Sequence, residues 1–171
     1  NAVTFVAFDQ SRNELGRRTY YSVGGGDIVE EGQDRPAEPD VYPLSTITDI
    51  KQWCLDTGRS YWEYVDQYEG PEIWEYLAQV WNVMKAAVLR GIEAEGVLPG
   101  GLCVTRKAVS YFVKASGYIG SLKSRGIVYA YALGVSEENA SGGEIVTAPT
   151  CGSCGVLPAV LYHLHTTKGF S

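Results

Sequence analysis

Residues 71–96 read PEIWEYLAQVWNVMKAAVLRGIEAEG and hold a long regular pattern of apolar side chains. The apolar positions recur at steps of three and four residues, at Ile73, Leu77, Val80, Met84 and Val88. Because an α-helix turns once in about 3.6 residues, this spacing places all of them on one face. Pro71 suits the first turn of a helix, where its missing N–H costs no hydrogen bond. The pattern predicts a long amphipathic helix that ends near Glu95 and buries this stripe in a core.

Further helices are predicted on both sides of this stretch. Ser45 or Thr46 can cap a helix that ends at Gly58, and Ser60 with Glu63 has the spacing of a capping box that opens a short helix. Three more helices are predicted around residues 107–116, 124–135 and 157–166. The fold class from about residue 45 onward is therefore mainly α.

The N-terminal part has a different texture. The stretches 3–8 and 17–23 are rich in β-formers and flank the turn-forming residues 9–13, which predicts a β-hairpin. Gly24, Gly25 and Gly26 end the second strand, and residues 27–40 then hold six acids against Arg35 alone. We interpret this acidic stretch as a solvated linker. Since two strands alone are marginally stable, we expect their sheet partners elsewhere, upstream of residue 1.

Composition excludes several classes of function. The 171 residues carry 14 basic and 20 acidic side chains, a net charge of −6, which disfavours binding to nucleic-acid phosphates. No apolar stretch approaches the roughly 20 residues that a bilayer requires, and no secretory signal opens the chain. We expect a cytoplasmic protein with no nucleic-acid or membrane partner.

Three glycine-bearing loops are predicted among the helices, at residues 98–101, 136–143 and 147–155. The third places Thr147, Thr150, Ser153 and two thiols directly before an apolar helix. Unpaired N–H groups at a helix start can bind a carboxylate or another anion and lower the pKa of a nearby thiol. The alternative is an ordinary helix cap whose cysteines are small apolar fillers.

The cysteines of the chain are too few, at these spacings, to complete a metal site. Cys151 and Cys154 form a C-x-x-C pair, which is typical of redox or metal sites, but structural zinc and four-iron clusters need further ligands. Cys54 lies inside a predicted helix and Cys103 follows the first loop, and we interpret both as core residues. His163 and His165 cannot share a metal from one helical face, because they lie about 200° apart.

Four segments resemble landmarks of the bacterial iron–sulfur-dependent L-serine dehydratases, also called L-serine ammonia-lyases. GGEIVTAPTCGSCGVLPAVLYHL (142–164) resembles the family signature, and EGVLPGGLCVTRKA (95–108) with ALGVSEENASGG (132–143) is similar to two further motifs in the same order. RRTYYSVGGGDIV (17–29) resembles the end of the family's small β-domain. The chain departs from the family's usual residues at Cys151, where many members have Asn, and at Cys154, where many have a small residue such as Ala.

The resemblance implies a domain organisation and an activity. Residues 1–30 would be the last strands of a small β-domain from an α/β sheet, 31–44 a linker, and 45–171 the first part of an all-α catalytic domain. The chain would then be the central fragment of a homodimeric enzyme and inactive alone. The implied reaction is β-elimination of L-serine to pyruvate and ammonia, with a four-iron, four-sulfur cluster as the Lewis acid. Most cluster ligands would lie beyond Ser171, and no residue of the chain is assigned as the general base.

The resemblance and the loop chemistry together give candidate residues for binding the substrate. They are Ser22, Gly24, Gly25, Gly26, Asn139, Thr147, Thr150, Gly152 and Ser153. Cys151 and Cys154 are candidate metal ligands, on the strength of their spacing at a helix start. We expect Glu138 to cap a helix rather than bind the substrate amine, and Arg106 with Lys107 to be a solvated pair.

Two other functional classes remain open from the sequence. A dithiol redox or zinc-binding protein would rest on the CGSC motif. A non-catalytic module that binds the substrate without a cluster would keep the same loop.

Overall fold

The computed structural model describes residues 1–24, 27–33, 40–147 and 151–169. The chain divides into two compact units, one formed by Asn1–Asp34 with Trp81–Ser171 and the other by Arg35–Val80. Six α-helices lie within the described ranges, with a small sheet at the N-terminus, so the mainly α prediction is confirmed. In the described part of the chain, no helix is both long and apolar enough to cross a membrane.

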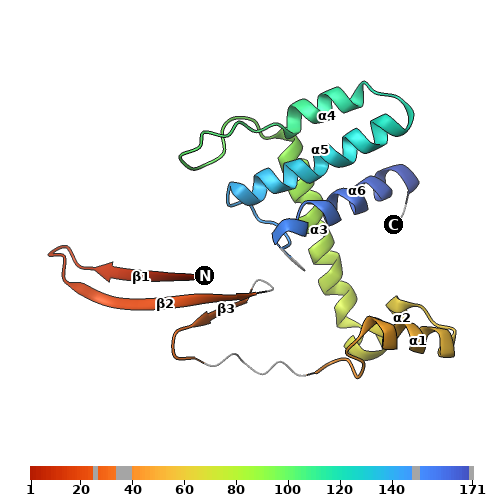
Figure 1. Ribbon diagram of the computed structural model, residues 1–171, viewed down its shortest axis with the longest axis horizontal. Coiled ribbons are helices and arrows are strands. Elements are labelled where there is room, and N and C mark those ends of the chain that lie inside the picture. The colour runs from red at the N-terminus through yellow and green to blue at the C-terminus, as the bar shows by residue number, and fades with distance from the viewer. Residues whose placement is uncertain (25–26, 34–39, 148–150, 170–171) are drawn as a thin grey trace. The chain divides into compact units, whose positions relative to one another are not determined.

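The N-terminal sheet has three antiparallel strands in the order β1-β2-β3, as Figure 1 shows. They are β1 (Ala2–Phe8), β2 (Glu14–Gly24) and β3 (Asp27–Glu30). The predicted hairpin is confirmed, with Val3 opposite Tyr20 and Asp9 holding the turn through a 2.8 Å hydrogen bond from the Asn13 N–H. The linker interpretation was wrong for 27–30: Ile28 and Val29 pair with β2, because an apolar pair suffices for a four-residue strand between acids.

Residues 40–80 contain α1 (Ile47–Thr57), α2 (Tyr61–Glu69) and the first part of α3 (Glu72–Glu93). The predicted cap is confirmed, since Thr46 accepts from the Asp49 N–H and Gly58 ends α1 with φ 68°. The capping box also forms, with the Ser60 N–H donating to Glu63 at 2.8 Å. Tyr64 is buried in this unit, and the rings of Tyr42, Trp53 and Tyr68 lie against it.

The long helix α3 confirms the predicted length but only part of the predicted core. Met84 and Val88 are buried, whereas Leu77 is 40% exposed. The core of the larger unit contains Ala87, Val88, Tyr131, Val135 and Ala159. The predicted burial of the stripe is therefore confirmed in the second half of α3 and wrong at Leu77. Helical periodicity shows which residues share a face, but it does not show whether another element covers that face.

Three helices complete the larger unit: α4 (Ala108–Ser116), α5 (Gly120–Ala140) and α6 (Val156–Lys168). In Figure 1, α4 and α5 run side by side as an antiparallel pair, and α6 packs along α5. A short 3-10 turn at Cys151–Ser153 leads into α6. The loop predicted at 136–143 was wrong for 136–140, which form the last turns of α5. Glu and Ala are good helix formers, and the helix gives way only near Gly142, whose φ is 75°.

Two glycines bring α3 and α5 into backbone contact. A Cβ placed on Gly91 would lie 2.3 Å from the backbone carbon of Gly134, and one placed on Gly134 would lie 2.9 Å from that of Gly91. No side chain fits between the two helices at this point. The crossing is therefore closer than any other residue pair would allow.

We expect Gly91→Ala to destabilise the protein by about 1–3 kcal/mol, because the new methyl group must push α3 and α5 apart. The gain in helix propensity offsets only about 1 kcal/mol of this. Urea unfolding followed by circular dichroism measures the change. Gly101→Ala is the matched control, since a Cβ there meets nothing within 4 Å. Equal stability of the two variants would show that the crossing can relax.

Candidate functional site

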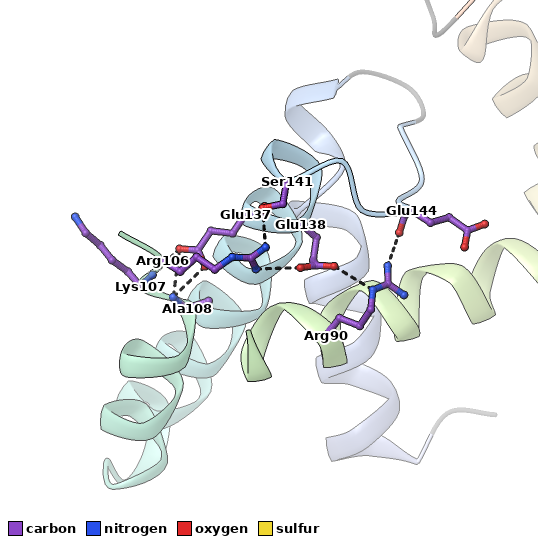
Figure 2. Close-up of polar contacts among 8 residues, drawn as sticks. All are labelled: Arg90, Arg106, Lys107, Ala108, Glu137, Glu138, Ser141 and Glu144. Atoms are coloured by element: carbon purple, nitrogen blue, oxygen red, sulfur yellow. Dashed lines mark hydrogen bonds and ion pairs between the residues drawn. The ribbon is translucent and has the colours of Figure 1, made fainter. Parts of the chain in front are cut away.

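A buried carboxylate at the end of α5 connects two arginines from other segments. Figure 2 shows Glu138 between Arg90 of α3 and Arg106 of the segment before α4. The Nε of Arg90 lies 3.0 Å from one oxygen of Glu138, and the Nη1 of Arg106 lies 2.9 Å from the other. The side chains of Glu138 and Arg106 are only 9% and 10% exposed. The charges of Glu138 and Arg106 are thus paired where water cannot solvate them well, whereas Arg90 is 43% exposed.

This arrangement sets the ionisation of Glu138. Burial raises the pKa of a carboxyl group, but hydrogen bonds from Arg90 and Arg106, and their positive charges, outweigh it here. The pKa of Glu138 therefore lies below its ordinary value of 4.5. The group is a carboxylate at neutral pH, and it stabilises the fold in that form.

Glu137, the preceding residue, holds the start of α4. Its carboxylate accepts hydrogen bonds from the backbone N–H groups of Lys107 at 2.7 Å and Ala108 at 3.3 Å. Lys107 is the N-cap of α4 and has no side-chain cap of its own. Glu137 therefore supplies from α5 the acceptor that a Ser or Asp cap would supply locally.

The same cluster fixes the segment that leads into the CGSC loop. Arg90 also donates to the backbone oxygen of Glu144 at 2.6 Å, and the Gly143 N–H donates to the backbone oxygen of Glu138 at 2.8 Å. Arg106 donates to the hydroxyl of Ser141 at 2.6 Å. We call Arg90, Arg106, Glu137, Glu138 and Ser141 the arginine–glutamate cluster.

The other end of the loop is held against α5 by close packing. Cys154 is 2% exposed, and Gly155 approaches so closely that a Cβ on it would lie 2.5 Å from the backbone oxygen of Ala132. The same Cβ would lie 2.7 Å from the hydroxyl of Ser136. Both ends of the loop are thus anchored on α5, about two turns apart along the helix.

The structure describes only some of the predicted substrate-binding residues. Thr147 and Gly152 are exposed and Ser153 is half-buried, whereas Thr150 and the side chain of Cys151 lie outside the described residues. Ser22 is exposed on β2 opposite Ile28, and β2 ends at Gly24. Gly25 and Gly26 also lie outside the described residues. Asn139 is half-buried in the last turns of α5.

Several expectations for single residues need correction. Arg106 is not part of a solvated pair, because it is buried against Glu138. Glu138 does not cap a helix end with its side chain, since its carboxylate holds the two arginines. Cys103 is exposed with φ 50°, and Cys54 is half-buried, so neither is a fully buried core residue. The sequence did contain a signal for this burial, namely two adjacent acids directly after an apolar run. Acids are rarely buried without a cation beside them, so such a pair is a reason to look for arginines that face it.

The four-iron cluster finds no ligand set in the described part of the chain. Its residues include no group of three His, Cys, Asp or Glu side chains placed to hold a metal ion. The thiol of Cys154 is buried, and Cys103 and Cys54 lie on separate segments. A four-iron cluster needs three or four thiolates, so the described residues do not fit one.

Each of the two histidines contacts a side chain of another helix. His165 lies edge-on against Trp81, with ring centroids 5.7 Å apart. The Nε2 of His163 lies 2.7 Å from the hydroxyl of Ser124 on α5. Neither residue belongs to the arginine–glutamate cluster.

We expect Glu138→Gln to cost about 3 kcal/mol at pH 7, because it leaves the buried Arg106 without a counter-charge. Since the folded pKa of Glu138 is lowered, its stabilisation is present above pH 4.5 and fades as the pH falls below that value. The difference between wild type and variant should therefore shrink on acidification. Urea titrations at a series of pH values measure it.

Glu144→Gln is the matched control for this prediction. Glu144 is exposed and contributes its backbone oxygen to the cluster, while Figure 2 shows its carboxylate turned away. Its variant should keep wild-type stability and wild-type pH dependence. A loss in Glu138→Gln that is the same at every pH would show that the carboxylate charge is not what stabilises the cluster.

Comparisons with known proteins agree on one family. A family model described as "Serine dehydratase alpha chain" matches residues 17–171. The L-serine dehydratase of Haemophilus influenzae is 41% identical over 174 residues, covering 94% of this chain and 38% of the relative. L-serine dehydratase 1 of Escherichia coli is 43% identical over 168 residues, covering 90% and 37%, and the L-serine dehydratase of Streptomyces coelicolor is 40% identical over 176 residues, covering 95% and 38%. The chain therefore spans less than two fifths of the length of these relatives.

Proposed function

Because the chain belongs to the serine dehydratase alpha chain family, we propose that it is part of an enzyme that converts L-serine to pyruvate and ammonia. The observation that carries the proposal is the match over residues 17–171, together with about 40% identity to relatives named L-serine dehydratase. In this reaction serine loses its α-proton and its hydroxyl group as water. The resulting enamine tautomerises to an imine, and water then hydrolyses it to pyruvate and ammonia.

We propose that the loop at 147–155 binds the carboxylate of L-serine. Thr147, Gly152 and Ser153 are not fully buried and lie on a segment whose two ends are anchored on α5. Anchoring matters because a binding group that is held in place loses less entropy when the substrate binds. The hydroxyl groups of Thr147 and Ser153 and the backbone N–H of Gly152 are neutral donors suited to a carboxylate.

The arginine–glutamate cluster has a positioning role in this proposal. Its two guanidinium groups are already paired with Glu138, so the cluster carries no free charge for the substrate. Its backbone hydrogen bonds to Glu144 and Gly143 instead hold the loop at its first anchor.

An iron–sulfur cofactor belongs to the proposal for the whole protein. The support for it is the sequence resemblance, and the described residues supply no ligand set. Cys151 and Cys154 remain candidate ligands on the strength of their spacing. No reaction step is assigned to a cluster in this chain. That the whole protein is a cytoplasmic homodimer also stays a prediction.

The dithiol alternative has less support from the structure. Reactive thiols are partly exposed to solvent, whereas Cys154 is 2% exposed. Zinc would need four ligands, and no such group is present among the residues with a described placement.

The test of the function uses anaerobic incubation with iron and sulfide, on the 171-residue chain and on a chain extended to the length of the relatives. Pyruvate formed from L-serine and bound iron are measured side by side. We expect both only in the longer chain. Absence of pyruvate from a folded, iron-loaded longer chain would contradict the proposal. A stable cluster in the short chain would instead assign ligand roles to its own thiols, which Cys151→Ser and Cys154→Ser, with Cys54→Ser as control, would locate.

The test of the binding loop is Thr147→Val in the longer chain. Losing one hydrogen bond to a carboxylate should lower kcat/KM for L-serine by about tenfold. Thr57→Val is the control, because the Thr57 hydroxyl donates to the backbone oxygen of Trp53 within α1. Equal activity of the two variants would remove Thr147 from the site.

A further inference from the structure

A cavity lies toward the C-terminal end of α6, whereas the CGSC loop lies at the start of this helix. Its volume is about 590 Å³, within the range of small-molecule sites. Its walls come from α4, α5 and α6. The lining residues used below are Phe112, Lys123, Ser124, Ile127, Tyr131, His163 and Lys168. His163, the first residue of α6 that lines the cavity, lies about 10 Å along the helix from Val156 at its start.

The charges around this cavity are positive, although the chain as a whole is acidic. Lys123 and Lys168 both line it, and neither makes an ion pair with a described residue. The acids of α4, α5 and α6 are Glu137 and Glu138 alone, both in the last turns of α5. Glu137 lies about 21 Å along the helix from Lys123. Among the described residues that line the cavity, none has a carboxylate side chain that could neutralise the lysines.

Polar groups also lie at the same wall. His163 lines the cavity, and its Nδ1 is buried without a hydrogen-bond partner among the described residues, although its Nε2 contacts Ser124. Because this Nδ1 is closed to solvent, His163 forms part of the wall, and its ring does not offer a free hydrogen-bonding atom to a ligand. Ile119, the N-cap residue of α5, makes no side-chain hydrogen bond to the helix. The first N–H groups of α5 therefore receive no acceptor from the N-cap side chain. Lys168 offsets the partial negative charge of the carbonyl end of α6.

The remaining wall is apolar. Phe112 and Ile127 are half-buried, and Tyr131 is 8% exposed with its ring stacked on that of Phe112 at 5.9 Å. A fully hydrated inorganic ion would gain nothing from these contacts. A ligand with a hydrocarbon part would bury apolar surface there.

We propose that this cavity binds a small organic anion, whose acidic head meets Lys123 and Lys168 and whose apolar body packs on Phe112, Ile127 and Tyr131. A carboxylate and a phosphate ester share this chemistry. The site is distinct from the proposed serine site, and its assignment does not depend on the activity of the protein.

The test is an NMR titration of the ¹⁵N-labelled chain with four probes: benzoate, phenyl phosphate, neutral benzamide and inorganic phosphate. We expect benzoate or phenyl phosphate to shift the amides of the first turns of α5 and the last turn of α6 in a saturable way. The tighter of the two identifies the head group. Benzamide should bind at least about fivefold more weakly than benzoate, because it lacks the charge. Inorganic phosphate should bind more weakly than phenyl phosphate, because it lacks the ring.

The variant pair isolates the lysines. Replacing both Lys123 and Lys168 with Gln should raise the dissociation constant of the tighter probe about tenfold. Lys114→Gln is the control, because Lys114 is an exposed lysine of α4 that does not line the cavity. Equal binding of benzamide and benzoate, equal losses in the control, or no shifts at α5 and α6 would each overturn the proposal. So would loss of binding in a chain extended to the length of the relatives, which would show that other residues fill the cavity.

Discussion

The ion pairs of Glu138 join parts of the chain that are far apart in sequence. Arg90 comes from α3, Arg106 from the segment before α4, and Glu138 from the end of α5. A buried carboxylate is costly unless it is paired and hydrogen-bonded, and here two guanidinium groups supply both. Because each arginine also donates to a further oxygen, of Glu144 or Ser141, the cluster fixes backbone as well as side chains. This cluster fixes the position of the segment before the CGSC loop.

Helix α5 is the platform on which these anchors lie. Gly134 lets α3 approach it at backbone distance, which brings Arg90 within reach of Glu138. Gly155 lets the start of α6 approach the same helix at Ala132. Glycine at both points is a consequence of close packing, since any Cβ would overlap backbone atoms. The described residues at the two ends of the loop are therefore held by contacts with α3 and α5.

The sequence was informative where structure is local. Thr46, Gly58 and the Ser60–Glu63 box were predicted because caps depend on residues three or four positions apart. Strand β3 and the last turns of α5 were missed, since acidic residues resemble a linker or loop until their partners are known. For the candidate site, residue types alone predicted a role for the CGSC loop, and that role stays a prediction. The burial of Arg106 could not, because its partner lies 32 residues away and no local pattern connects them.

The geometry of Glu138 also decides how loss of activity should be interpreted. Both oxygens of Glu138 accept a hydrogen bond from an arginine, so its carboxylate is held in one position by two segments of the chain. Removing it would loosen the anchor of the segment before the CGSC loop. If the loop binds substrate as proposed, activity would fall through a change in the position of the loop. A fall caused by loosening should raise KM and lower stability together, and should be partly restored by conditions that stabilise the fold. A fall caused by lost contact with the reacting atoms would lower kcat in a fully folded protein. In the proposed function, the ion pairs of Glu138 give it a positioning role, which acts through the backbone hydrogen bonds at the first anchor of the loop.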